Sequence, residues 1–182
     1  MNYPNKESIR QAMLQQRRSV TAAQRAQAGQ ELLAKLQQDP KFIQAETIGL
    51  YHPLADELDT RPAMAWCWQA GKKVALPCCR EGKMALFFVT GEQALVPGQF
   101  GILEPVDNAV NKADEIDYLC VPSLAVDADH YRVGYGKGMY DKFLAEQGVH
   151  MGKVVYLAYA KALIPSCLPG AHDIQADEIC VV

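Results

Sequence analysis

The sequence lacks an apolar run approaching the roughly 20 residues that a membrane-spanning helix needs. It starts with polar residues and shows no apolar signal segment, so we expect a cytoplasmic protein. Its formal net charge of −3 over 182 residues gives no general attraction to nucleic acid or to an anionic membrane. We therefore expect one domain over residues 1–182 and a monomer, in which any anion site is local.

The cysteines lack the spacing of a structural metal site. The chain has six cysteines, but they form no C-x-x-C pair, and Cys78 and Cys79 are adjacent. A zinc site is therefore not expected. Cys120 and Cys180 lie in apolar runs, which is typical of small core residues.

Two common nucleotide-binding motifs are missing. The P-loop pattern fails because Tyr131 stands where its first glycine belongs, and Gly138 follows Lys137 where Ser or Thr would bind magnesium. The dinucleotide pattern G-x-G-x-x-G fails because Met139 takes the place of its third glycine. No G-x-S-x-G is present either, so the sequence does not indicate a Ser-His-Asp enzyme.

What the sequence does contain is one stretch rich in glycines and charges. Arg132-Val-Gly-Tyr-Gly-Lys-Gly-Met-Tyr-Asp141 follows an apolar run at 116–122 and leads into a helical pattern at 139–147. Alternating glycines let backbone N–H groups turn toward one anion, and the positive end of a following helix adds to the attraction. The pattern predicts a phosphate-binding loop; a plain glycine-rich turn is the alternative.

The rest of the chain alternates between helical and strand patterns. We expect helices over 5–18 and 22–37, the second opened by a capping box at Thr21 and Gln24, and a third capped by Thr60. The expected strands cover 47–51, 73–77, 84–89, 116–122 and 153–158, a last strand lies within 172–182, and 97–105 is a loop. This order predicts a layered α/β fold with an open, largely parallel sheet flanked by helices.

Three segments together resemble the 5-formyltetrahydrofolate cyclo-ligase family, also called methenyltetrahydrofolate synthetases. They are Arg132-x-Gly-x-Gly-Lys-Gly-x-Tyr-Asp141, Asp56-Glu-x-Asp-Thr60 and His172-Asp-Ile-x-x-Asp177. The resemblance covers nearly the whole chain and implies a NagB/RpiA/CoA transferase-like fold. It also implies a ligase of one-carbon metabolism that converts 5-formyltetrahydrofolate to 5,10-methenyltetrahydrofolate, with ATP as co-substrate and Mg²⁺ as cofactor.

The resemblance assigns the nucleotide phosphates to two parts of the chain. Lys6 and Arg10 are four residues apart, on one helix face. By pattern alone they are solvated surface, as Arg17 and Arg18 are, but the family uses such a pair to reach the phosphates. The set expected to bind ATP is Lys6, Arg10, Arg132, Gly134, Tyr135, Gly136, Lys137, Gly138, Met139 and Tyr140, and Lys137 and Arg132 are also expected to be catalytic.

The resemblance assigns the folate to two further segments. Glu57 matches a glutamate that binds the folate, and Phe100 matches an aromatic that stacks on the pterin. His52 lines the same pocket, although some relatives carry an apolar residue there. Tyr135 and Met139 complete the set, and Met139 stands where relatives usually have Tyr or Phe. Without the resemblance, Glu57 could equally complement the start of a helix and Phe100 could anchor its loop.

Carboxylates close to the glycine stretch suit a magnesium ion. Asp141 lies in the first turn of the expected helix, and Mg²⁺ usually takes one or two protein carboxylates together with phosphate and water; a helix cap is the alternative. The resemblance adds Asp173 as a second carboxylate connected with Mg²⁺, with Asp177 nearby. Asp127 and Asp129 are expected to be ordinary turn residues.

Two other functions remain open from the sequence. The chain could be a non-catalytic protein that binds a folate or a nucleotide, which binding without turnover would reveal. It could also be an enzyme on a similar scaffold that acts on a sugar phosphate or a CoA ester, because a fold does not decide a function.

Overall fold

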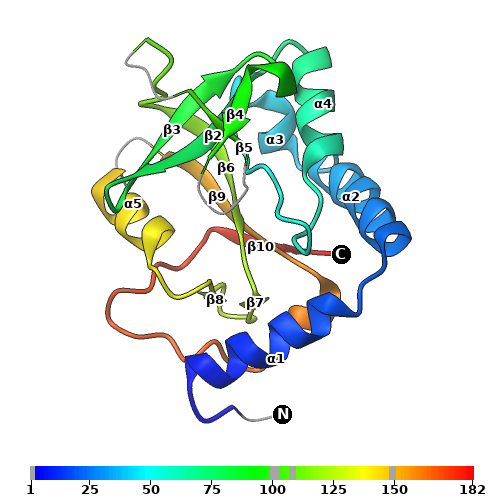
Figure 1. Cartoon of the computed structure of the whole chain (residues 1–182), viewed down its shortest axis with the longest axis vertical. Coiled ribbons are helices and arrows are strands. Elements are labelled where there is room, and N and C mark those ends of the chain that lie inside the picture. The colour runs from blue at the N-terminus through cyan, green and yellow to red at the C-terminus, as the bar shows by residue number, and fades with distance from the viewer. Residues whose placement is uncertain (1–2, 99–102, 107–109, 148–150) are drawn as a thin grey trace.

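A computed structural model describes residues 3–98, 103–106, 110–147 and 151–182, and Figure 1 shows their arrangement. Phe100 lies outside the described residues. The helices are α1 (Lys6–Arg18), α2 (Ala22–Leu36), α3 (Pro40–Gln44), α4 (Arg61–Gln69) and α5 (Met139–Gln147). The strands are β1 (Thr47–Gly49), β2 (Lys73–Arg80), β3 (Lys83–Val89), β4 (Leu95–Pro97), β5 (Leu103–Pro105), β6 (Ile116–Pro122), β7 (Ala125–Val126), β8 (Arg132–Val133), β9 (Met151–Ala158) and β10 (Glu178–Val181).

The first two helices begin where the sequence predicts. The amide of Ser8 donates to the side chain of Asn5 at 2.9 Å, and the capping box of Thr21 and Gln24 is present. Thr60 is the N-cap residue of α4, as predicted, but its side chain makes no capping hydrogen bond. The Thr60 hydroxyl donates instead to the carbonyl of Tyr51 at 2.5 Å, because Thr60 is fully buried against the preceding loop.

The central sheet confirms the predicted α/β architecture. Its strand order is β10-β9-β6-β1-β2-β3. The first five of these strands are mutually parallel, and β3 pairs antiparallel with β2 at the edge. The hairpin turn between β2 and β3 uses Glu81 and Gly82, both with positive φ. The sheet is therefore largely parallel with one antiparallel edge strand, a common arrangement in α/β folds.

The prediction of a loop over 97–105 is wrong at both ends. Leu95–Pro97 and Leu103–Pro105 form a two-stranded antiparallel pair, β4 with β5. Proline lacks an N–H and is confined to edges and strand ends, and both strands end in proline. The prolines and the short strand lengths hid this pair from a search for alternating apolar residues.

Helices cover both faces of the central sheet. One core contains Ile9 and Met13 of α1 with Phe143 of α5, and the other contains Leu32 of α2 with Met64 of α4. Side chains of successive strand residues enter opposite cores, as the period of a strand requires. In Figure 1, α2, α3 and α4 lie on one side of the sheet and α5 on the other, with α1 near one end.

The order of the strands creates a switch point. From β1 the chain moves to β2 on one side and later to β6 on the other. In open α/β sheets, ligands bind outside the carboxyl ends of the strands at such a point. The segment after β1 and the glycine stretch near the end of β6 both belong to this edge. Within the described ranges, no helix is long and apolar enough to cross a membrane.

Candidate active site

One cavity of about 340 Å³ lies at this edge of the sheet. That volume falls within the usual range for small-molecule sites. It collects every site residue predicted from the sequence that the structure describes: Lys6, Arg10, His52, Glu57, Arg132, Gly134, Tyr135, Gly136, Lys137, Gly138, Met139, Tyr140, Asp141 and Asp173. Residues that are far apart in the chain therefore share one binding space.

The glycine loop, defined here as residues 134–138, forms one wall of the cavity. It connects β8 to the first turn of α5, so the strand that leads into the loop is the short β8 rather than β6. A Cβ on Gly134 would lie 2.7 Å from a terminal nitrogen of Arg132, so any larger residue there would displace this guanidinium. The loop and the helix start have the geometry of an anion site.

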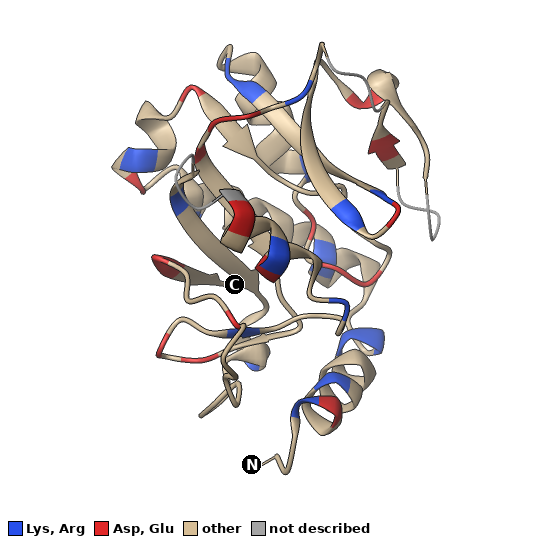
Figure 2. Ribbon diagram, turned by 90° about the vertical axis from the view of Figure 1, so that its left-hand side faces the viewer, with Lys and Arg blue, Asp and Glu red and all other residues tan. Residues whose placement is uncertain are grey.

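Two cations of α1 approach the glycine loop from the other side. The Nε of Arg10 donates to the carbonyl of Gly134 at 3.0 Å, and Lys6 forms an ion pair with Asp173. Figure 2 shows the basic segments along α1. The N-terminal half of α1 is thus bound to the cavity wall. These positions fit the prediction that Lys6 and Arg10 do more than form a solvated surface.

Arg132 is a buried cation at the bottom of this arrangement. Its side chain is 6% exposed and donates from a terminal nitrogen to Asp141 at 2.8 Å. The guanidinium carbon lies 5.6 Å from the ring centroid of Tyr140 and 5.1 Å from that of Tyr156, within cation–π range. These contacts fix the guanidinium at the glycine loop, where its remaining donors can meet a ligand.

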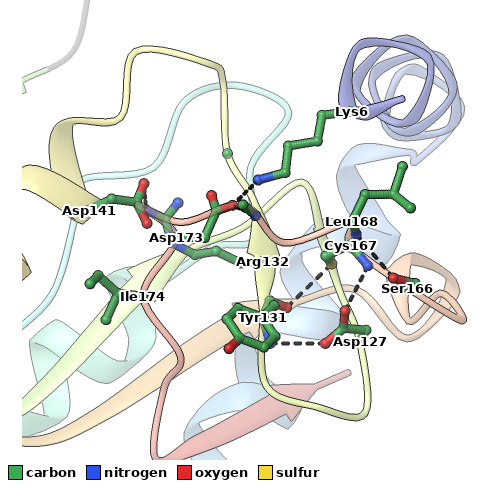
Figure 3. Close-up of polar contacts among 12 residues, drawn as sticks. Lys6, Asp127, Tyr131, Arg132, Asp141, Ser166, Cys167, Leu168, Asp173 and Ile174 are labelled. Atoms are coloured by element: carbon green, nitrogen blue, oxygen red, sulfur yellow. Dashed lines mark hydrogen bonds and ion pairs between the residues drawn. The ribbon is translucent and has the colours of Figure 1, made fainter. Parts of the chain in front are cut away.

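The C-terminal segment adds Asp173 to the same group. Figure 3 shows Asp173 close to Arg132, Asp141 and Lys6. Burial raises the pKa of Asp173, but hydrogen bonds from Lys6 and from the amide of Gly170 outweigh it, and the pKa is lowered overall. Asp173 therefore stays ionised to lower pH than an ordinary aspartate.

The segment after β1 supplies His52, Leu54 and Glu57 to the cavity. Glu57 is 6% exposed, and its carboxylate accepts from the amide of Leu54 at 2.9 Å. Burial raises the pKa of Glu57, although the Leu54 amide, Arg17 and the Tyr135 hydroxyl act in the opposite direction. Burial also lowers the pKa of His52, which favours a neutral imidazole. Both side chains can hydrogen-bond a polar heterocycle.

One buried hydroxyl in the cavity wall lacks a hydrogen-bond partner among the described residues. The Tyr140 Oη is buried and makes no hydrogen bond within the described part of the chain. A buried polar atom without a partner is costly, so a bound ligand could satisfy it. The neighbouring Cys79 thiol has a pKa raised by burial and by Glu104, which disfavours a thiolate nucleophile.

The carboxylates fit a magnesium ion bound together with phosphate. Among the residues that the structure describes, no three His, Cys, Asp or Glu side chains group as a metal cage. Magnesium needs only one or two protein carboxylates, and Asp141 and Asp173 both line the cavity. Each uses Oδ2 for its ion pair, so Oδ1 is the oxygen to consider for a metal. Asp177 is bound elsewhere, since it accepts from the amide of Val154 at 2.7 Å.

Sequence reasoning missed part of the wall. Cys79, Met84 and Glu104 reach the cavity from β2, β3 and β5, and their local sequence gives no sign of it, because the hairpin and the β4–β5 pair must first fold over the sheet. Arg17 was expected on the surface, but it is 4% exposed. Ile9, Met13 and Arg17 are the buried residues of α1, so their four-residue spacing was an available signal.

The chain matches known proteins along its whole length. The model of the 5-formyltetrahydrofolate cyclo-ligase family matches residues 2–182. The 5-formyltetrahydrofolate cyclo-ligase of Haemophilus influenzae is 32% identical over 187 residues, covering 100% of both chains. That of Escherichia coli strain K12 is 30% identical over 135 residues, covering 71% of this chain and 74% of the relative.

Solved structures agree in fold. The NMR structure of Aquifex aeolicus 5,10-methenyltetrahydrofolate synthetase superposes with a TM-score of 0.83 at 27% identity and covers 97% of this chain and 89% of that one. The Mycoplasma pneumoniae 5,10-methenyltetrahydrofolate synthetase has a TM-score of 0.74 at 20% identity, with 96% of each chain covered. Sequence and fold together show that the chain belongs to the 5-formyltetrahydrofolate cyclo-ligase family.

Proposed function

We propose that the protein closes the ring of 5-formyltetrahydrofolate to give 5,10-methenyltetrahydrofolate, using ATP and Mg²⁺ and releasing ADP and phosphate. The observation that carries the proposal is the lining of this cavity, which combines two sets of residues. One set is the cations and the glycine loop, which we call the phosphate end; the other is Glu57 and His52 with apolar side chains such as Leu54 and Met84, which we call the folate end. Such a cavity suits a polyphosphate and a flat, partly polar heterocycle bound side by side.

The reaction needs an activated oxygen. The N5-formyl group is an amide and N10 is a weak nucleophile, so direct closure would expel an oxide. Transfer of a phosphoryl group from ATP to the formyl oxygen makes that oxygen a leaving group. N10 then forms a bond to the formyl carbon and gives up its proton, the carbon–oxygen bond breaks, and phosphate leaves with the oxygen.

The phosphate end can supply what phosphoryl transfer requires. Catalysis of this step consists mainly of positioning and charge neutralisation. We assign the phosphates to the glycine loop, Lys6 and Arg10, and the transferring group to Lys137 and Arg132. Asp141 and Asp173 would hold Mg²⁺, which would neutralise phosphate charge. No thiolate or serine nucleophile is needed.

The folate end can orient the reacting group. We assign Glu57, His52, Tyr135 and Met139 to the folate. Tyr140 interacts with both Glu57 and Arg132 and offers a hydroxyl that has no hydrogen-bond partner among the described residues. The methionine replaces an aromatic contact with a thioether contact, which can also be favourable. We also assign Phe100 to stacking on the pterin. We further propose that the protein acts as a cytoplasmic monomer built of one domain.

The direct test is the growth of ultraviolet absorbance. The methenyl product has a conjugated amidinium chromophore that the substrate lacks. We expect absorbance to rise when purified protein meets 5-formyltetrahydrofolate and Mg-ATP, and to stay flat without ATP or with EDTA. Turnover without ATP would contradict the proposed activation step, and tight folate binding without turnover would favour a binding protein.

Gly136 provides a test of the phosphate assignment. Its φ is +98°, and an added Cβ would lie 3.3 Å from the Arg10 guanidinium carbon. We expect Gly136→Ala to raise KM for ATP about tenfold, because the substitution strains the loop and displaces Arg10. KM for the folate should change less than threefold.

Gly71→Ala is the matched control. Gly71 also has a positive φ, +74°, but a Cβ there would meet nothing within 4 Å. Both substitutions should destabilise the fold by roughly 1 kcal/mol, measured by urea denaturation, whereas the control should keep its KM for ATP. An equal effect on ATP in the two variants would show that lost stability, rather than the loop, is responsible.

A further inference from the structure

Arg17 is a buried cation outside the cavity wall. It is 4% exposed, and a buried charge is costly unless it is well paired. No carboxylate in the described part of the chain lies within ion-pair distance of it. Such an arrangement has a stability cost, so the contacts that Arg17 does make are informative.

Those contacts are with the groups around Glu57. One terminal nitrogen of Arg17 donates to the Tyr135 hydroxyl at 3.0 Å, and the other donates to the carbonyl of Ser123. The guanidinium carbon lies 5.9 Å from the ring centroid of Tyr159. Arg17 therefore connects α1 to the glycine loop, to the end of β6 and to the end of β9.

Both tyrosines in turn hold Glu57. The Tyr135 hydroxyl lies close enough to the Glu57 carboxylate to lower its pKa, and the Tyr159 hydroxyl donates to the Glu57 carbonyl at 3.1 Å. The amide of Leu54 binds the same carboxylate. Glu57 and Tyr135 line the cavity, whereas Arg17 and Tyr159 do not. The guanidinium thus supports the cavity residues from behind.

We infer that Arg17 is a positioning residue for the folate end of the site: it fixes the Tyr135 hydroxyl and, through it, the carboxylate of Glu57, without touching the substrate. This inference rests on the proposed role of Glu57 in binding the folate. The fixed carboxylate can then accept hydrogen bonds from the N–H groups of a heterocycle in one geometry. A loss of Arg17 should therefore affect the folate and spare ATP.

The charges around Glu57 agree with this role. Burial raises the pKa of Glu57, and Asp56 raises it further, while the Leu54 amide, Arg17 and Tyr135 lower it. The hydroxyls of Tyr51 and Tyr140 also face the carboxylate. Because Arg17 is the cation in this group, its removal should raise the pKa of Glu57, and the ionised form should appear at higher pH.

The test is a comparison of Arg17→Met with Arg18→Met. Arg18 is the exposed neighbour on α1 and serves as the matched control. We expect Arg17→Met to raise KM for 5-formyltetrahydrofolate about tenfold, to leave KM for ATP and kcat within about twofold, and to shift the midpoint of folate binding to higher pH. Arg18→Met should match the wild type in all these measurements.

A double-mutant cycle shows whether Arg17 acts through Tyr135. In a Tyr135→Phe background, the Arg17→Met substitution should cost less than about threefold in KM for the folate, because the shared contact is already lost. Arg17→Lys keeps the charge but loses the planar set of donors, so its KM for the folate should fall between those of the wild type and Arg17→Met. If Arg17→Met does not fold, Arg17→Lys takes its place in the cycle.

Three results would overturn the inference. Arg17→Met could leave KM for the folate unchanged, raise KM for ATP equally, or show additive losses with Tyr135→Phe, and each would exclude a positioning role through Tyr135. If the wild type still converts the folate in these cases, the proposed function stands. A wild-type protein without ATP-dependent turnover would contradict both the proposed function and the inference about Arg17.

Discussion

Replacement of Arg132 by methionine is expected to lower kcat by about 10³-fold, in the range found for arginines that neutralise a transferring phosphoryl group. The side chain is 6% exposed and is held by Asp141 at 2.8 Å. It lies beside the glycine loop, where it can meet the proposed phosphate. Methionine keeps the length of the side chain and removes the charge, and absorbance of the methenyl product measures the loss.

The same substitution should also destabilise the fold, and the two effects can be separated. Without Arg132, Asp141 is a partly buried charge that loses the one ion-pair partner it has among the described residues, which is unfavourable. The double variant Arg132→Met/Asp141→Asn removes both charges, so it should recover most of the lost stability in urea denaturation. It should recover no activity, because the cation is still missing.

Arg132→Lys gives the intermediate case. Lysine keeps the charge but not the planar fork that binds Asp141 and a ligand oxygen together. We expect activity between that of the wild type and that of the methionine variant. If Arg132→Met were folded and kept kcat within fivefold of the wild type, Arg132 would have no role in charge neutralisation.

The glycine loop shows what the sequence predicts well. Its residues are adjacent in the chain, and the strand at 116–122 and the helix at 139–147 were predicted with the bounds that the structure gives. Each of these elements has a local signal: an apolar run for the strand, a helical pattern for the helix, and the glycines for the loop. Lys6 and Arg10 could be placed only by resemblance, because a polar helix face looks the same whether it meets water or a ligand.

Residues that act through distant contacts were not predictable in this way. Arg17 looks like a surface residue beside Arg18, and only its contacts with Ser123, Tyr135 and Tyr159 show that it is buried. Asp127 looks like a turn residue, and only the return of the C-terminal segment reveals its second partner. In both cases the deciding contact joins segments separated by more than 30 residues, for which a single sequence has no local signal.

Asp127 leads to the second large expected effect, a loss of stability. Asp127 is 1% exposed. Oδ1 accepts from the amide of Tyr131 at 2.9 Å, and Oδ2 accepts from the amide of Cys167 at 2.7 Å. Figure 3 shows the carboxylate between these two segments. It joins the residue that precedes Arg132 to the segment that leads to Asp173.

Asp127→Ala should therefore lower the free energy of unfolding by about 2–5 kcal/mol, because one buried and one partly buried amide lose their acceptor, at roughly 1–3 kcal/mol each. Asp127→Asn keeps one carbonyl oxygen and should lose about half as much. Asp129→Ala is the matched control in the same turn; its side chain is exposed, so a change below about 0.5 kcal/mol is expected. Urea denaturation measures all three.

The same variants relate stability to the site. Because Asp127 ties together the segments that carry Arg132 and Asp173, Asp127→Asn should raise KM for ATP at a temperature where the protein remains folded, while KM for the folate changes little. The folate end depends on Glu57 and on the Arg17 contacts, which Asp127 does not join. If Asp127→Ala stayed within 1 kcal/mol of the wild type, the two amides would have other acceptors, and this carboxylate would be the ordinary turn residue that its local sequence suggests.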